Sequence, residues 1–339
     1  MFNRITRSIF PAVGVLLLIL DSRTALVGAQ SAVELCISSI IPTLFPFLVM
    51  SAMLTSSING SNLRFFRPLN RLLGIPNGTE GIFITGILGG YPTGAQAVYQ
   101  SWRSGQLSKA DAKRMLTFCS NAGPAFIFGI LGTKFSLGII PWLLWGVHIA
   151  SAIAVALTHP NKERCTCTAS LSNTVSFAQA LKNAVATMGN ICGWIVLFRV
   201  ILSFMNRWLL WLLPTEARVV VYGLLELANG CCSADLIAPE GLRFILCSVM
   251  LSFGGICVAM QTTSIVGVLG IWNYIKGKLL QGAISLVLSS GIQLLVFTDR
   301  NQIYIPIYII GFALVSLCLY CVLQHKIEKK SSISVPIGV

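Results

Sequence analysis

Three ionisable residues interrupt apolar stretches of this chain, and such residues are costly to place in hydrocarbon. They are Glu34, Arg199 and Glu226. Glu226 and Asn229 are three residues apart, so they would share one face of a helix. Two interpretations follow. Glu226 and Asn229 could face a solute cavity with Arg199 as the charge partner, or Glu226 and Arg199 could form a structural ion pair that joins two segments.

Three amide side chains lie beside glycine-containing interruptions of apolar segments: Gln96, Asn121 and Gln261. An amide offers hydrogen-bond donors and acceptors without charge, which suits a neutral polar solute or a bond between helices. Tyr91 could stack on a ring or lie at the membrane interface. Gly90 beside it would permit close approach of the backbone to a solute.

No catalytic or metal-binding constellation accompanies these residues. The three histidines are scattered along the sequence, and there is no HExxH motif, Walker A motif or nucleophile elbow. Cys165 and Cys167 form a CxC pair without a second pair at zinc spacing, and the eleven cysteines show no disulfide framework. We therefore expect no enzyme, no metal site and no cofactor.

The elements that must position these residues are strongly apolar. Of the 339 residues, 55% are hydrophobic and only 10% are charged, whereas a soluble domain carries about 25% charged residues. Apolar stretches recur from Ile9 to Val322. This composition predicts an all-α, polytopic membrane protein with roughly seven to ten membrane-embedded segments. The first stretch resembles a signal peptide, but we favour an uncleaved helix because many more segments follow.

The net charge of +13 is concentrated in short connections between the apolar stretches. This is the positive-inside distribution of a membrane protein, and no nucleic-acid partner is expected. Basic clusters at 64–71 and 103–114 flank segment 80–100. If both clusters are cytoplasmic, segment 80–100 is re-entrant, with its tip near Gly89–Pro92. The alternative is that one cluster violates the rule.

Six apolar segments carry proline, glycine or small polar residues in their middles, which predicts breaks in the helices. In hydrocarbon, the freed backbone groups must be satisfied by protein or by a water-filled cavity. The order of the breaks resembles an internal repeat, which in transporters indicates a site at the bilayer midplane. Close helix packing through GxxxG spacing is the alternative. The breaks are expected at Pro42 and Pro46, Gly89–Pro92, Ser120–Pro124, Gly189–Asn190, Glu226–Gly230 and Phe253–Gly255.

Four motifs occur in order along the chain: Gly90–Ala95, Phe118–Gly129, Glu226–Gly230 and Phe253–Gln261. Together they resemble the motifs of the sporulation integral membrane protein YlbJ family, which belongs to the nucleoside-recognition, or Gate domain, group. The resemblance runs from about Glu34 to Ile265. It implies a multi-pass protein in the cell membrane of an endospore-forming bacterium. Its Gate domains would be similar to parts of nucleoside transporters and of the ferrous-iron transport protein FeoB. The family's substrate is not established.

We divide the chain into five parts: an N-terminal transmembrane helix (1–29), a first Gate-like half (30–157), a polar connecting loop (158–175), a second Gate-like half (176–298), and a C-terminal transmembrane helix with a basic tail (299–339). We expect transport or gating of a small polar solute needed for spore formation, with the lipid bilayer as the surroundings. The alternative is a membrane scaffold that recruits partners during assembly of the spore envelope or cortex. Either could act as a homo-oligomer or with sporulation membrane partners. The expected solute-binding residues are Gly90, Tyr91, Gln96, Asn121, Glu226, Asn229 and Gln261, with Arg199 as the charge partner.

Overall fold

The computed structural model describes residues 2–59, 72–76, 78–159 and 175–297, and every regular element within these ranges is helical. Within them, five helical stretches are long and apolar enough to cross a membrane. The prediction of a polytopic α-helical membrane protein is therefore confirmed. The expected C-terminal transmembrane helix with its basic tail (299–339) and the CxC pair lie outside the described residues. The five stretches are Ser22–Leu54, Ile140–Thr158, Phe177–Trp208, Glu240–Leu269 and Trp272–Val296.

The first long unit is almost continuous. It comprises α1 (Phe2–Leu20), α2 (Ser22–Leu35), the π-helical turn η1 (Cys36–Ile40) and α3 (Ile41–Asn59). The helix bends at Asp21, whose carboxylate caps α2 by accepting a hydrogen bond from the Thr24 N–H at 3.2 Å. The expected first helix at 1–29 thus divides at Asp21, and its second part continues into the next segment.

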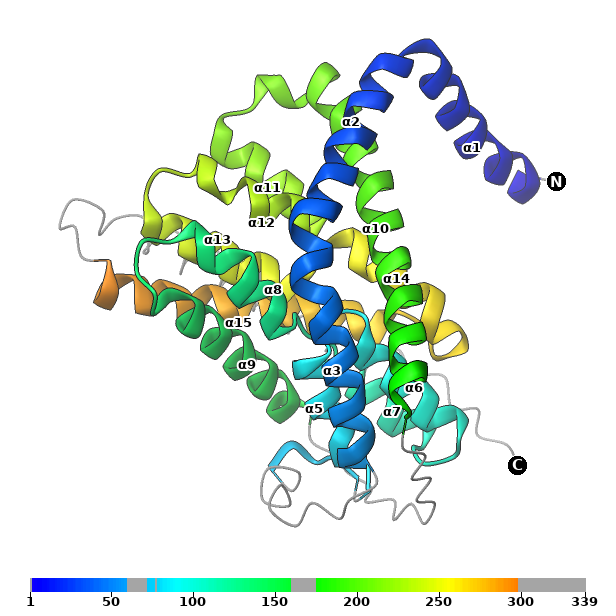
Figure 1. Cartoon of the computed structure of the whole chain (residues 1–339), viewed down its shortest axis with the longest axis vertical. Helices are drawn as coiled ribbons and strands as arrows, with labels where there is room; N and C mark the ends of the chain where they lie inside the picture. The colour runs from blue at the N-terminus through cyan, green and yellow to red at the C-terminus, as the bar shows by residue number, and fades with distance from the viewer. Residues whose placement is uncertain (1, 60–71, 77, 160–174, 298–339) are drawn as a thin grey trace, which may run out of the picture.

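The second long unit is α10 (Phe177–Trp208), which runs antiparallel to α2 and α3 (Figure 1). Near the Asp21 bend, Arg207 forms an ion pair with Asp21 at 3.0 Å. The two helices approach closely at Gly28, where a Cβ atom would lie 3.2 Å from the Cα atom of Val200. Such close approach at a small residue is typical of helix packing in membranes.

Two of the six expected breaks are absent, so those predictions are wrong. Pro42 and Pro46 lie within continuous helix, directly after the π-helical turn η1. The Thr43 hydroxyl donates to the Ser39 carbonyl oxygen at 2.6 Å, which satisfies a backbone acceptor beside the proline. Gly189 and Asn190 lie in uninterrupted α10, because a single glycine weakens a helix without ending it.

The other four expected breaks are present. They form two pairs, and the elements around each pair follow the same order along the chain. A helical hairpin comes first: α5 (Glu80–Leu88) and α6 (Thr93–Arg103) turn at Gly89–Pro92, and α11 (Thr215–Leu225) and α12 (Leu227–Cys232) turn at Glu226. A broken segment follows, and then one long helix. In the first half, α7 (Lys109–Met115) and α8 (Pro124–Gly129) form the broken segment, and α9 (Ile140–Thr158) is the long helix. In the second half, α13 (Glu240–Phe253) and α14 (Gly255–Val266) form the broken segment, and α15 (Trp272–Val296) is the long helix.

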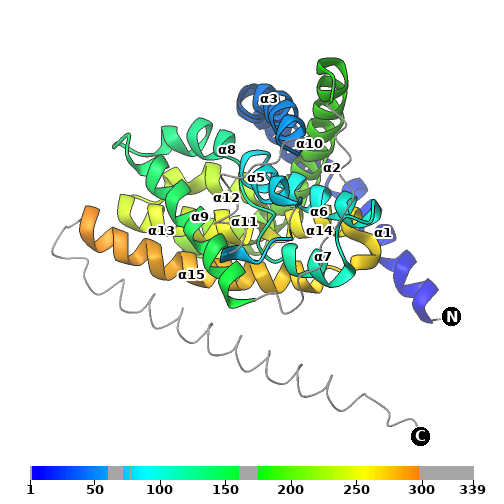
Figure 2. The same cartoon turned by 90° about the horizontal axis from the view of Figure 1, so that it is seen from below.

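Two groups of helices lie on opposite sides of the molecule. In Figure 2, α9, α13 and α15 lie side by side, and α3 and α10 form a separate pair at the far side. Of the hairpin helices, α5, α11 and α12 lie between these two groups. Short 3₁₀ turns connect several of these elements: η3 (Leu131–Lys134), η4 (Leu210–Leu212), η5 (Ser233–Leu236) and η6 (Gly267–Leu269).

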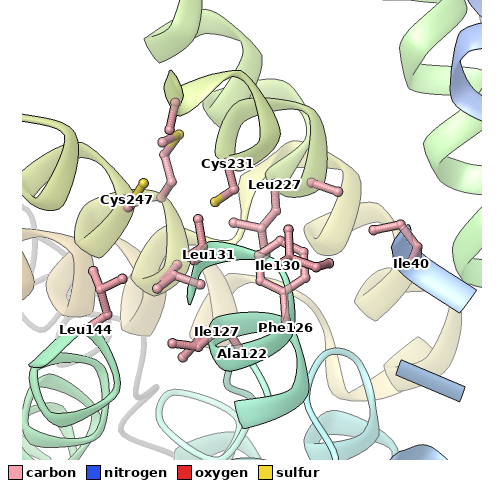
Figure 3. Packing of buried hydrophobic residues seen from close by; sticks show 14 of the residues in the cluster. Ile40, Ala122, Phe126, Ile127, Ile130, Leu131, Leu144, Leu227, Cys231 and Cys247 are labelled. Atoms are coloured by element: carbon pink, nitrogen blue, oxygen red, sulfur yellow. The ribbon is translucent and has the colours of Figure 1, made fainter. Parts of the chain in front are cut away.

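One buried apolar cluster joins the two repeats. Figure 3 shows Phe126 and Ile130 of the first repeat next to Leu227 of the second, with Ile40 nearby. Phe126 is 7% and Leu227 is 6% exposed, so the contact between the two repeats is buried. Lipid tails are as apolar as these side chains, so close packing stabilises this contact more than expulsion of water does.

Candidate functional site

A cavity of about 80 Å³ is lined by three of the four breaks and by α14, the helix that follows the fourth. This volume accommodates several water molecules or part of a small solute. The first hairpin turn and the first broken segment line one part of it, and Glu226–Ala228 and α14 line another. Residues of α3 and α10 complete the wall, which is largely apolar. The side chains with polar groups on the wall are Tyr91, Glu226 and Gln261.

The structure brings together most of the residues singled out in the sequence. Gly90, Tyr91, Glu226 and Gln261 line the cavity. Asn121 and Asn229 are buried directly behind the wall, at 1% and 0% exposure. Gln96 is different, because it lies on an exposed face of α6 and does not line the cavity.

The first and second breaks touch through their backbones at Gly90 and Gly123. Gly90 has φ of +75°, and a Cβ atom there would lie 3.1 Å from the Gly123 nitrogen. A Cβ atom on Gly123 would lie 3.1 Å from the Gly90 Cα atom. The left-handed conformation and this close contact both favour glycine at position 90. The two turns therefore form one continuous part of the cavity wall.

Glu226 caps α12 and does not lie within a helix. Its backbone is extended, with φ −146° and ψ 121°. One carboxylate oxygen accepts from the Ala228 N–H at 2.9 Å. The other accepts from the N–H and the side-chain amide of Asn229, at 2.6 Å and 2.8 Å. The prediction that Glu226 and Asn229 share a helical face is therefore wrong, and their contact comes from capping.

Arg199 reaches this carboxylate only through Asn229. Its guanidinium donates to the Asn229 side-chain oxygen at 2.8 Å and to the Ser31 hydroxyl at 3.1 Å. Among the described residues, ion pairs join Lys134 with Asp235 and Arg207 with Asp21, and none joins Arg199 with Glu226. A direct ion pair was one of the two sequence-based interpretations, and the structure replaces it with a chain mediated by an amide.

Lys278 on α15 is a further buried charge that the sequence interpretation missed. It is 1% exposed, and its ammonium donates to the Gln281 side-chain oxygen at 2.6 Å and to the Tyr91 hydroxyl at 3.1 Å. It also lies 5.0 Å from the centre of the Tyr91 ring, a cation–π distance. The signal in the sequence was a lysine in an apolar helix. It was missed because Lys278 lies near the expected start of its segment.

A buried polar network extends from Lys278 behind the cavity wall. The Gln281 amide donates to the Asn121 side-chain oxygen at 3.1 Å. The Ala122 N–H donates to His148 Nε2 at 2.9 Å, so Nε2 carries no proton, and Nδ1 lies 3.2 Å from the Ser252 hydroxyl. The network thus connects the first hairpin turn, the first broken segment and the end of α13.

These features define a class: a multi-pass α-helical membrane protein whose broken helices converge on an internal cavity. The chain is similar to the sporulation integral membrane protein YlbJ of Bacillus subtilis (strain 168), with 31% identity over 128 residues. The match covers 35% of this chain and 30% of that protein. The resemblance predicted from the motifs is thereby confirmed. No family model and no solved structure matches the chain.

Proposed function

We propose that this chain moves or gates a small polar solute across the membrane during spore formation, and that the solute occupies the cavity between the breaks. The name of the similar B. subtilis protein supports the setting. The observation that carries the proposal is the convergence of three helix breaks and of α14, which follows the fourth break, on one cavity. Irregular backbone at membrane depth is tolerated where protein buries it or where it lines a cavity.

The chemistry of the wall favours a solute that donates hydrogen bonds. The side-chain oxygen of Gln261 receives no hydrogen bond from a described residue, and its amide nitrogen contacts only the Cys257 sulfur at 3.4 Å. The Glu226 carboxylate accepts three hydrogen bonds, and a carboxylate offers about four lone-pair sites. A hydroxyl or amino group of the solute would bind these acceptors, and an apolar ring or chain would contact the remaining wall.

Reconstitution of the full chain into liposomes tests this proposal. The panel should include nucleosides and other small polar metabolites, with uptake and efflux measured separately. Wild type should move at least one member, and Gln261→Leu should slow that movement. The matched control is Gln96→Leu, which replaces the same side chain on an exposed face outside the cavity. Equal rates for the two variants would contradict a solute site at Gln261.

The scaffold alternative makes the opposite prediction in cells. A scaffold needs the folded protein but no cavity, so Gln261→Leu would support sporulation as well as wild type does. Under our proposal, Gln261→Leu should reduce the yield of mature spores at unchanged protein level, and Gln96→Leu should not. Spore counts in a strain that depends on this protein distinguish the two.

A further inference from the structure

The surroundings of Lys278 are suited to binding and releasing a proton. An ammonium group has three donors, but two neutral oxygen acceptors contact it, those of Gln281 and Tyr91. No carboxylate among the described residues forms an ion pair with it. A buried ammonium without an anionic partner is costly, so the neutral amine is an accessible state.

The neutral amine would keep two hydrogen bonds in this geometry after one hydroxyl rotation, one donated to Gln281 and one accepted from Tyr91. At present the Tyr91 hydroxyl accepts from Lys278 and donates to the Leu251 carbonyl oxygen at 3.0 Å. After Lys278 loses its proton, the nitrogen lone pair can accept a hydrogen bond from the Tyr91 hydroxyl. The amine still donates to Gln281. Loss of the proton would therefore release the Leu251 carbonyl from Tyr91.

This exchange would affect the cavity, because Tyr91 forms part of its wall. The bond from Tyr91 to Leu251 connects the first hairpin turn with α13, two residues before its end at Phe253. The Tyr91 ring also packs over Gly254, where a Cβ atom would lie 3.3 Å from the ring. The charge on Lys278 thus determines whether the first hairpin turn is bonded to the helix that precedes the fourth break.

We propose that Lys278 is a proton-binding site that couples movement of the solute to movement of a proton. The inference rests on the proposed function. In the step itself, a hydronium ion gives a proton to the lone pair of Nζ: an N–H bond forms as an O–H bond of the hydronium breaks, and the products are the ammonium and a water molecule. Protonation favours the Tyr91–Leu251 bond, and deprotonation favours the Tyr91–Lys278 bond, so the two states differ at the cavity wall.

Other titratable groups face Lys278 and must be separated from it experimentally. They are Tyr91 in the hairpin turn, Tyr274 on α15 itself, Cys119 in the first broken segment and His148 on α9. From α13, the neutral Leu251 carbonyl and Ser252 hydroxyl belong to the same network. His148 is the main competitor because an imidazole titrates near neutral pH in its unperturbed state.

Thermal midpoints of the full chain in nanodiscs, measured between about pH 6 and pH 9, test the proton site without any solute. One linked proton changes the unfolding equilibrium up to about tenfold per pH unit. The difference in midpoint between wild type and Lys278→Met should therefore vary with pH. For the control Lys276→Met, on the same helix, the difference should stay constant. Parallel curves for wild type and Lys278→Met, or a pH dependence removed only by His148→Asn, would overturn the proposal.

If Lys278→Met does not fold, two measurements remain decisive. Lys278→Arg keeps a permanent charge, so its midpoint should lose the pH dependence of wild type. In wild type alone, hydrogen exchange at 89–93, corrected for its intrinsic pH dependence, should change as the Tyr91–Leu251 bond is lost. Retained pH dependence in the arginine variant, or corrected exchange that does not depend on pH, would exclude Lys278 as the site.

Liposomes loaded with a pH-sensitive dye test the coupling. Movement of a solute by wild type should change the internal pH, and Lys278→Arg should remove that change. If a solute moves with sodium and without a pH change, proton coupling is wrong and the proposed function stands. If the midpoints show the proton site but no solute moves, the proposed function fails and the proton site remains.

Discussion

Gly86 and Gly94 face each other across the turn of the first hairpin, and a Cβ atom on Gly94 would lie 2.8 Å from the Gly86 Cα atom. Gly223 and Gly230 face each other in the same way across the turn at Glu226. Each hairpin thus has its own pair of glycines, and each pair lets the two helices of its hairpin pack backbone to backbone. The GxxxG interpretation and the broken-helix interpretation of the sequence therefore describe the same feature, since close packing holds each break in place.

The first prediction concerns this packing. In Gly94→Ala, the new methyl group would collide with the Cys119 carbonyl oxygen and with Gly86, and backbone atoms cannot turn aside as a flexible side chain can. We expect a loss of more than about 2 kcal/mol of stability, seen as low folded yield in detergent. Gly189→Ala is the control, because open space surrounds Gly189 in α10. It should be neutral or stabilising by up to about 1 kcal/mol. Equal yields for the two variants would contradict the packing argument.

The second prediction separates backbone strain from contact at the cavity. Gly90 and Gly105 have nearly the same positive φ, +75° and +78°, but a methyl group would meet neighbouring atoms within 4 Å only at Gly90. Both alanine variants should lose about 1–2 kcal/mol from left-handed strain. Gly90→Ala should lose a further 1–3 kcal/mol, roughly, from the contact with Gly123. Thermal midpoints measure the difference, and transport should fall in Gly90→Ala alone. Equal midpoints would mean that the Gly90–Gly123 contact yields easily.

The third prediction is a topology. The Arg114 guanidinium donates to the His159 carbonyl oxygen at 2.8 Å, so the basic segment 103–114 and the end of α9 lie at one membrane face. The Ser136 hydroxyl donates to Glu240 at 2.9 Å, which places the start of α9 with the start of α13. With 103–114 in the cytoplasm, Gly138 should lie outside.

Cysteine labelling checks this arrangement in intact cells. Ser104 and Gly138 are both exposed, and a cysteine at Gly138 meets open space. In a background without other accessible thiols, an impermeant reagent added outside should label Gly138→Cys and spare Ser104→Cys. The reverse pattern would place the basic segment outside. The connecting loop expected at 158–175 falls mostly outside the described residues.

The sequence predicts a helix break correctly where the cause of the break lies within a few residues of it. Gly90, Gly254 and Glu226 interrupt their helices as expected, because the causes are local: a positive φ in the two glycines, and a carboxylate that caps its own helix. Pro42 was predicted to break its helix and does not. The compensation involves a neighbouring π-helical turn and the Thr43 hydroxyl, and proline composition alone does not reveal either.

The candidate site shows the same division. Tyr91 and Gln261 were found because they adjoin glycine-containing breaks. Gln96 adjoins the same break as Tyr91, but α6 begins at Thr93 and turns Gln96 to an exposed face. Lys278 and its partner Tyr91 are 187 residues apart in the sequence. Only the fold brings that pair together.

The last prediction concerns the chain from Arg199 through Asn229 to Glu226. Because Arg199 and Glu226 do not touch, a double-mutant cycle with Arg199→Gln and Glu226→Gln should give a coupling below about 1 kcal/mol. A cycle between Arg199→Gln and Asn229→Ala should give more, in the range of about 1–3 kcal/mol, because it removes a direct hydrogen bond from a charged group. The exposed pair Arg207–Asp21 is the control, and its coupling should not exceed about 1 kcal/mol.

Glu226→Gln should be destabilising by itself, whether or not Glu226 binds solute. Both carboxylate oxygens accept backbone N–H groups, and a glutamine can offer only one acceptor oxygen at this position. We expect a loss of about 1–3 kcal/mol, whereas Glu34→Gln on the exposed face of α2 should be silent. A loss of folding stability in Glu226→Gln therefore cannot assign a transport role to Glu226, whereas the transport rate per folded molecule can. Transport per folded molecule should fall in Glu226→Gln and stay normal in Arg199→Gln, whose guanidinium is not part of the cavity wall. Equal loss of rate in the two variants would mean that the whole chain of residues, and not the carboxylate alone, sets the shape of the cavity.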